Sequence, residues 1–152
     1  MLMEQTSKEI VGIGEIADYL PQKSPMIMID CLYVCDGLDT TAGFRIRPDN
    51  IFVKDGVFTE PGIVENIAQT AAARGGYEVK KHGATPLLGF IGAVKDLKIY
   101  FHPPVGAEII TEVSKKNEVF SVTLISGRTT CNGKLVAECE MKIFILKPES
   151  KS

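Results

Sequence analysis

Residues 55–76 read DGVFTEPGIVENIAQTAAARGG and predict one long helix, largely enclosed by the rest of the chain. Thr59 can cap this helix with its hydroxyl, and Pro61 suits the first turn, where a missing N–H costs nothing. Apolar side chains then recur at helical spacing. The basic residues 80–82, followed by Gly83, indicate where the helix ends.

One acid lies on the side of this helix that we expect to be buried. Glu65 stands among apolar and small residues, and Gln69, four positions later, shares its face. A buried carboxylate is costly unless it is paired or used, so Glu65 is a candidate functional group, with a structural or solvated glutamate as the alternative. The small residues Ala68, Ala71, Ala72, Ala73, Gly75 and Gly76 predict that a sheet curls closely around the helix backbone.

Length and composition fit a single α+β domain, residues 1–152, of which 45% are hydrophobic. A net charge of -2 offers no basic face for nucleic acid. The longest apolar run, 87–94, is too short to span a bilayer, and the first residues do not resemble a signal peptide. We therefore expect a soluble, cytoplasmic protein that binds neither nucleic acid nor membrane. The four cysteines lack the paired spacing of a zinc site, and no metal is predicted.

The other segments predict an antiparallel sheet. A short helix ends near Leu20, and residues 26–35 and 40–47 predict a β-hairpin. After Pro86 the chain predicts strands to its end, with the first at 87–100, the second at 107–114, a turn at Lys116-Asn117, and a last pair of strands joined at Asn132-Gly133.

The turn at Asn132-Gly133 is a strong two-residue hairpin signal and sets a register for the last two strands. That register places Phe120 opposite Ile145, Val122 opposite Ile143 and Leu124 opposite Met141 on one apolar face. A sheet with one apolar face needs a cover, and the long helix is the only segment that is long and apolar enough.

An antiparallel sheet wrapped around one long central helix resembles the hotdog fold. Within that fold, three segments resemble the β-hydroxyacyl-ACP dehydratases. They are LPQKSPM at 20–26 with Asp30 downstream, IVENIAQ at 63–69 with its acid followed by Ala-Gln, and GFIG at 89–92 through FHPPVG at 101–106. The compact stretch between Gly56 and the acid is similar to the shorter relatives from aryl-polyene and related acyl-chain pathways.

The resemblance implies a dimer, either a homodimer or a heterodimer with a related dehydratase, with two tunnels at its interface. Each tunnel would accept an acyl chain on the phosphopantetheine arm of an acyl carrier protein (ACP) or of CoA, with no further cofactor. The reaction implied is loss of water from a 3-hydroxyacyl thioester in fatty-acid or polyene-type synthesis. In the family a histidine removes the α-proton, the helix acid of the other subunit handles the departing hydroxyl, and a helix N-terminal amide polarises the thioester carbonyl.

The resemblance also assigns roles to positions of this chain. Glu65 matches the helix acid, and Gln69 would orient that acid or bind substrate, with an ordinary helix-surface glutamine as the alternative. The positions that would bind substrate are Val57, Phe58, Gly62 and Gly89, of which Gly62 would carry the carbonyl-binding amide.

The chain departs from the family at both histidines. Val57 falls where the catalytic histidine is expected and cannot take a proton, and Gln22 replaces the second one. His102, between a strand and two prolines, is a candidate catalytic group, whereas the helix C-terminal dipole is enough to explain His82. The Lys-Asp pair at 54–55 could supply a base, although a loop aspartate usually forms a turn.

Three functions fit these residues. The first is a 3-hydroxyacyl-ACP dehydratase-like protein whose retained site acid is Glu65. The second is a catalytically silent, acyl-binding subunit that pairs with an active dehydratase, which the loss of both histidines favours. The third is an acyl thioesterase, because hotdog thioesterases can activate water with one helix carboxylate.

Overall fold

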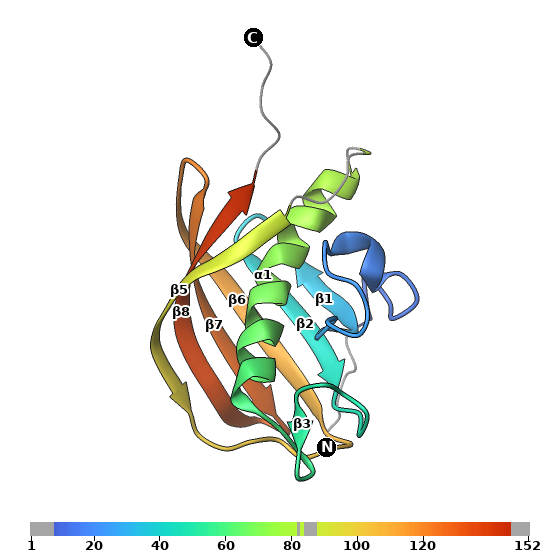
Figure 1. Ribbon diagram of the computed structural model, residues 1–152. Helices are drawn as coiled ribbons and strands as arrows, with labels where there is room; N and C mark the ends of the chain where they lie inside the picture. Colours follow the sequence, from blue (N-terminus) through green and yellow to red (C-terminus); the bar gives the residue numbers. More distant parts are fainter. Residues whose placement is uncertain (1–7, 82, 84–87, 147–152) are drawn as a thin grey trace.

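The computed structural model describes residues 8–81, 83 and 88–146. A six-stranded antiparallel sheet curves around one long helix, α1 (Glu60–Lys81) (Figure 1). A short 3-10 helix, η1 (Ile16–Tyr19), packs against α1. Both helices lie where the sequence predicts them, and the α+β architecture with one central helix is confirmed. None of the helices in this described part is long and apolar enough to cross a membrane.

The sheet has the strand order β1-β2-β6-β7-β8-β5, and a separate two-stranded hairpin, β3-β4, precedes α1. The strands of the main sheet are β1 (Cys31–Cys35), β2 (Asp39–Arg45), β5 (Leu88–Ile99), β6 (Glu108–Val119), β7 (Val122–Cys131) and β8 (Lys134–Leu146). The small hairpin consists of β3 (Val53–Lys54) and β4 (Val57–Phe58). It places β4 directly before the start of α1.

The predicted turn at Lys116-Asn117 is wrong. Strand β6 continues to Val119 and absorbs this pair in an irregularity between Lys115 and Asn117. The chain reverses instead at Phe120, whose φ is 56°. A β-bulge accommodates one extra residue without ending a strand, so polar residues that favour turns can stay inside it.

The Asn132-Gly133 hairpin is confirmed, because both residues have positive φ and Cys131 lies opposite Lys134. The predicted register holds only next to the turn. An irregularity at β7 residues 129–130 shifts the pairing by one, so Val122 lies opposite Phe144 rather than Ile143.

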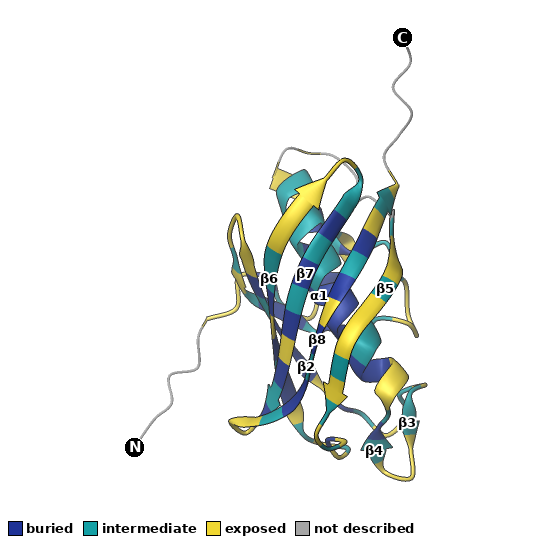
Figure 2. Ribbon diagram, turned by 90° about the vertical axis from the view of Figure 1, so that its left-hand side faces the viewer, coloured by how far each residue is buried: buried dark blue, intermediate teal, exposed yellow. Residues whose placement is uncertain are grey.

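A shift of one residue exchanges the two faces of a strand. The inward face of β7 therefore carries Thr123 and Ile125, not Val122 and Leu124, and Phe120 is 91% exposed. Figure 2 shows the resulting alternation of buried residues with intermediate or exposed ones along β7 and β8. The inward assignment of Met141 and Ile143 on β8 is confirmed, since both are buried.

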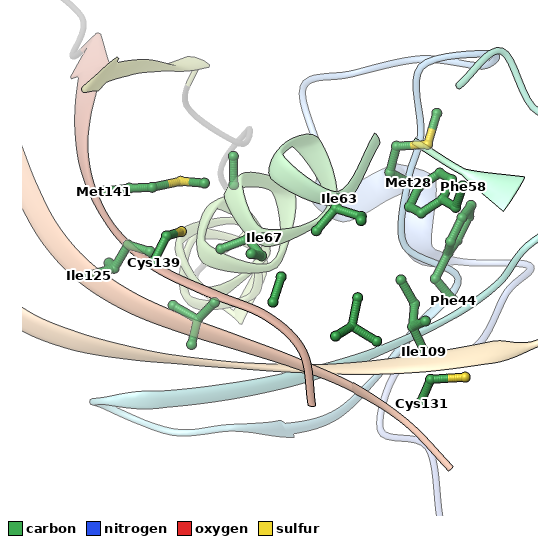
Figure 3. Close-up of a cluster of buried hydrophobic side chains, with 14 of the residues drawn as sticks. Met28, Phe44, Phe58, Ile63, Ile67, Ile109, Ile125, Cys131, Cys139 and Met141 are labelled. Atoms are coloured by element: carbon green, nitrogen blue, oxygen red, sulfur yellow. The ribbon is translucent and has the colours of Figure 1, made fainter. Parts of the chain in front are cut away.

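The main core lies between α1 and the concave face of the sheet (Figure 3). Ile63 and Ile67 of α1 are fully buried there. Gly127 of β7 lets the helix approach closely, because a Cβ atom at this position would come within 2.5 Å of the Ile67 Cγ2 atom. A second core cluster joins η1 and β1 to Ala73 of α1.

Candidate active site

The N-terminus of α1 is tied to the loop before β3. The Thr59 carbonyl accepts hydrogen bonds from the N–H groups of Gly62 (3.0 Å) and Ile63 (3.1 Å). The Thr59 hydroxyl, which the sequence assigns to capping, instead donates to the Phe52 carbonyl at 2.5 Å. This residue therefore joins the helix start to the loop before β3.

Glu65 is half-buried on the second turn of α1, and the structure pairs it with Gln69 as their spacing predicts. The Gln69 Nε2 atom donates to Glu65 Oε2 at 3.1 Å. A neutral amide holds the carboxyl group in place without adding a charge beside it. The hydrogen bond therefore fixes the position of the Glu65 carboxyl group.

Gln69 also holds the N-terminal loop against the helix. Its Nε2 atom donates to the Met26 carbonyl at 2.7 Å, and its Oε1 atom accepts from the Met28 N–H at 2.7 Å. The side chain is fully buried, and its two N–H groups and its oxygen all have partners. The prediction that Gln69 orients Glu65 agrees with this geometry, and the reading as a surface glutamine is wrong.

A row of hydrogen-bonded polar side chains is buried beneath the helix, and the sequence did not predict it. Asn66 donates to the Met28 carbonyl at 2.7 Å and accepts from the Thr111 hydroxyl at 2.5 Å, and Thr111 lies 2.8 Å from the Thr129 hydroxyl. These side chains fix α1 to the loop on one side and to β6 and β7 on the other. The sequence signal was the polar Asn66 at a helix position surrounded by apolar residues.

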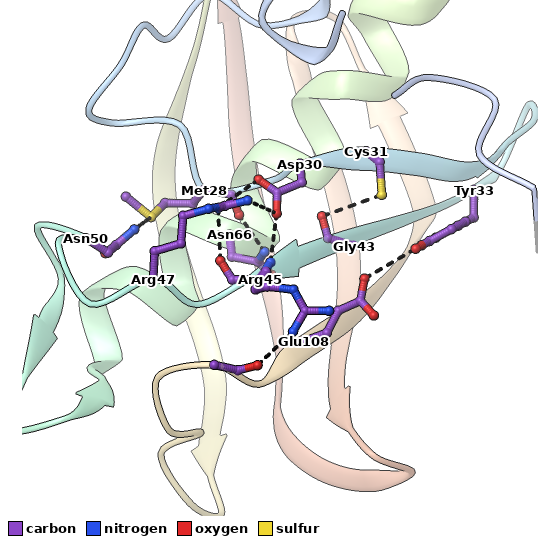
Figure 4. A network of polar contacts seen from close by, with 11 residues as sticks. Met28, Asp30, Cys31, Tyr33, Gly43, Arg45, Arg47, Asn50, Asn66 and Glu108 are labelled. Atoms are coloured by element: carbon purple, nitrogen blue, oxygen red, sulfur yellow. Dashed lines mark hydrogen bonds and ion pairs between the residues drawn. The ribbon is translucent and has the colours of Figure 1, made fainter. Parts of the chain in front are cut away.

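Asp30 anchors the start of the sheet by binding both a backbone N–H group and an arginine side chain. It accepts from the Arg45 N–H at 2.8 Å and forms an ion pair with Arg47 at 3.1 Å (Figure 4). The Arg45 side chain donates to the Gly106 carbonyl at 2.7 Å. This network braces the loop that contacts Gln69.

The predicted substrate-binding residues Val57, Phe58 and Gly62 lie together at the helix start. The Phe58 ring is buried beside that of Phe44. A Cβ atom on Gly62 would come within 2.5 Å of the Phe58 ring, so this glycine makes room for the ring. Its N–H already donates to Thr59 within the helix turn.

The loop after β5 lies against β4. The Phe58 N–H donates to the Pro103 carbonyl at 2.9 Å, and Val57 forms a bridge with Pro104. His102 therefore belongs to a segment next to Val57, and its side chain is exposed. Across the described residues, the hydrogen-bond partner of the Glu65 carboxylate is Gln69 and not an imidazole. His82 lies outside the described residues.

Two further predicted positions lie away from Glu65. Asp55 and Gly56 form the tight turn between β3 and β4 with φ angles of 53° and 79°, which supports the turn-forming role of this aspartate. Gly89 lines a cavity beside the C-terminal half of α1. The structure therefore separates Gly89 from the other predicted site residues.

Other kinds of site find little support. Within the described ranges, no group of three or more His, Cys, Asp or Glu side chains could hold a metal ion. Burial raises the pKa of the Cys139 thiol to about 11 and also raises the pKa of Cys35. Thiols with raised pKa values are poor nucleophiles at neutral pH, so the candidate chemistry rests on Glu65.

Comparison with known proteins places these residues in a family. The family model described as ApeP-like, ApeP dehydratase, matches residues 14–151. A curated protein, the 3-hydroxyacyl-[acyl-carrier-protein] dehydratase FabZ of Rhizobium etli, is 27% identical to this chain over 156 residues. The match covers 95% of each of the two chains.

Solved structures share the fold. The dehydratase heterocomplex ApeI:P from Xenorhabdus doucetiae has a TM-score of 0.77 at 13% identity, over 87% of this chain and 91% of that one. A hypothetical thioesterase from Streptococcus pneumoniae, solved with coenzyme A, has a TM-score of 0.60 at 9% identity, over 78% and 87% of the two chains. These likenesses confirm the hotdog fold. Because the family match spans nearly the whole chain, this protein belongs to the ApeP-like dehydratase family.

Proposed function

We propose that this chain is the acid-supplying subunit of a 3-hydroxyacyl-thioester dehydratase in fatty-acid or polyene-type chain synthesis. Its substrate would be carried on the phosphopantetheine of an ACP or of CoA in the cytoplasm. The observation that carries the proposal is the Glu65 carboxyl group, which the Gln69 amide holds in place on the second turn of α1. The FabZ relative, named as a dehydratase of acyl-carrier-protein substrates, supports the substrate class.

Dehydration requires a base and an acid acting on neighbouring carbons. The base removes the α-proton, a double bond forms, and the hydroxyl leaves as water after Glu65 donates its proton to it. The positive end of the α1 dipole favours the negative charge that develops on the thioester oxygen. The half-buried position of Glu65 suits proton transfer, and the hydrogen bond from Gln69 keeps the carboxyl group oriented.

The base is the group that this chain supplies least well. Val57 cannot accept a proton, the His102 side chain is exposed, and Asp55 occupies a turn. We therefore infer that the histidine comes from a partner subunit of the same fold. A related fold occurs in a complex described as a dehydratase heterocomplex, which supports a heteromeric assembly.

The sheet edge at β5 suits such an assembly. Strand β5 pairs with β8 on one side only, and among the described residues no strand covers its other side. Phe90, Ile91 and Val94 of this strand are 50%, 37% and 37% exposed. An exposed, apolar edge strand is stabilised by pairing with another chain.

The test is to measure dehydration of a 3-hydroxyacyl-ACP by the chain alone, by a hotdog dehydratase of the same organism that has a histidine at the position matching Val57, and by the two together. We expect little turnover by this chain alone and a rise of at least ~100-fold over it in the mixture. Full activity of this chain alone would exclude the need for a partner histidine.

The same assay separates the alternatives. Equal activity of the partner with and without this chain, together with binding of acyl-ACP by this chain, would identify a silent acyl-binding subunit. Release of free carrier thiol without formation of the enoyl product would identify a thioesterase. The thioesterase-like neighbours share the fold at 9% identity, which by itself does not favour hydrolysis.

A further inference from the structure

Two neighbouring side chains of α1 hold the backbone of one residue in the N-terminal loop. The Asn66 Nδ2 atom donates to the Met28 carbonyl at 2.7 Å (Figure 4), and the Gln69 Oε1 atom accepts from the Met28 N–H at 2.7 Å. Residues three positions apart on a helix lie side by side, so Asn66 and Gln69 bind Met28 from one face of α1. The Met28 side chain is fully buried in the main core, so its backbone and its side chain are both held.

The row of hydroxyl groups beneath Asn66 has one direction. Thr111 donates its single hydroxyl proton to Asn66 Oδ1 at 2.5 Å, so the Thr129 hydroxyl must be the donor in the 2.8 Å contact between the two threonines. All three side chains are at most 1% exposed. The threonines of β6 and β7 therefore set the orientation of the Asn66 amide, whose oxygen faces the sheet and whose N–H group faces the Met28 carbonyl.

Met28 in turn sets the orientation of the Gln69 amide. A backbone N–H can only donate, so Gln69 must turn its oxygen toward the Met28 N–H and its NH2 group away from it. That NH2 group then donates to the Met26 carbonyl at 2.7 Å and to Glu65 Oε2 at 3.1 Å. A Gln69 amide turned the other way would place its oxygen beside the Met26 carbonyl oxygen, and neither atom has a proton to donate.

The orientation of Gln69 decides which oxygen of Glu65 carries a transferable proton. A carboxyl group accepts hydrogen bonds best at its carbonyl oxygen, so acceptance from Gln69 by Oε2 leaves the acidic proton on Oε1. In dehydration this proton must point at the departing hydroxyl. Displacing a reacting group by about 1 Å can lower a rate by ~100-fold, so small movements of Gln69 matter.

We propose that Asn66 is a positioning residue for the dehydration. By holding the Met28 carbonyl, Asn66 keeps Gln69 in the orientation that directs the acidic proton of Glu65 toward the departing hydroxyl. The inference rests on the proposed function, because it requires Glu65 to be the proton donor. It goes further by connecting the site, through Asn66, to the buried hydroxyl groups of β6 and β7.

The test measures kcat and KM for dehydration of a 3-hydroxyacyl-ACP by Asn66→Leu in the mixture with the related dehydratase, after subtraction of the rate of that dehydratase alone. Leucine is close to asparagine in shape and removes the donor to Met28. We expect kcat to fall by about 10- to 100-fold, because the Glu65 proton is displaced. KM should change by less than about twofold, because the predicted substrate-binding residues at the start of α1 are unaltered.

A milder pair of variants tests the same row where Asn66→Leu fails to fold. Thr111→Val removes the hydroxyl that orients Asn66 and keeps the shape of the side chain, and Thr111→Ser restores the hydroxyl. We expect kcat to fall by about 3- to 10-fold for Thr111→Val and to return to within about twofold for Thr111→Ser. Thr70→Val is the matched control and should keep its kcat, because the Thr70 hydroxyl is also fully buried but donates to the Asn66 backbone carbonyl within α1.

A measurement without substrate tests the contact itself. Amide hydrogen exchange of the Met28 N–H should be faster by about tenfold in Asn66→Leu, because the loop loses one of the two side chains that hold this residue. Exchange of the Ile67 N–H, inside α1, should stay unchanged.

The outcomes separate the two proposals. An unchanged kcat for folded Asn66→Leu, an equal loss of kcat for Thr111→Val and Thr70→Val, or unchanged exchange of the Met28 N–H would refute the role of Asn66 and leave the proposed function standing. Absence of dehydration by the unaltered protein, both alone and in the mixture, would refute both. Thermal melting of each variant confirms that the fold is retained.

Discussion

Gln69 is the residue on which the site geometry depends most. Its amide contacts two backbone groups of the N-terminal loop and the Glu65 carboxyl group. Helical spacing in the sequence is enough to place Gln69 on the same face as Glu65. The same spacing places the Glu65 acid on the buried side of the helix. The sequence could not find the contacts to Met26 and Met28, because these residues lie about 40 positions away in the chain and only the fold brings them close.

Replacing Gln69 with Met keeps the length of the side chain and removes its hydrogen bonds. The Met28 N–H and the Met26 carbonyl would then lose a buried partner each. We expect the free energy of unfolding to fall by roughly 2–4 kcal/mol. Urea denaturation measures the change, and Lys23→Met, at an exposed position of the N-terminal loop, is a control that should change little. If Gln69→Met lowers the free energy of unfolding by less than about 0.5 kcal/mol, the Gln69 hydrogen bonds do not stabilise the fold.

At the scale of elements, the helix and the Asn132-Gly133 hairpin follow from local chemistry, and the strand register does not. A two-residue turn fixes pairing only beside itself, and the shift at residues 129–130 of β7 changes every pair beyond it. The extra residue is Val136 of β8, an ordinary strand-forming valine, so the sequence could not reveal which face of β7 is buried. The turn predicted at Lys116-Asn117 failed for a related reason, since β6 absorbs the pair in a bulge.

The neighbouring glycines of α1 provide a test of packing within one element. Gly75→Ala should stabilise the protein by about 0.5–1 kcal/mol, because alanine favours a helix and the new methyl group meets open space. Gly76→Ala should destabilise it by at least ~2 kcal/mol, because the methyl group would collide with the Tyr19 carbonyl. Chemical denaturation of both variants checks the contrast. Equal effects of the two substitutions would contradict the packing described for η1.

At the scale of the whole molecule, a histidine supplied by a partner requires a second subunit, which we place at the β5 edge. Val94→Lys places a charge among the exposed apolar residues of this strand, and burying that charge in an interface is costly. We expect this variant to be monomeric by light scattering at micromolar concentration, while the unaltered protein is a dimer or joins a related subunit. Ile13→Lys, at an exposed apolar position away from β5, should leave the assembly intact. A monomeric unaltered protein, with or without the related dehydratase, would contradict the shared-site account.

We propose that Glu65 transfers a proton in the assembled enzyme, and the rate of dehydration of a 3-hydroxyacyl-ACP by the Glu65→Gln variant tests this role. Glutamine preserves the shape of the side chain and removes its titratable proton. Glu60→Gln, at an exposed position in the first turn of the same helix, is the matched control for the loss of one charge. We expect the rate to fall by at least ~100-fold for Glu65→Gln with unchanged thermal melting, and we expect near-full activity for Glu60→Gln. A Glu65→Gln enzyme that folds, assembles and keeps its full rate would contradict the claim.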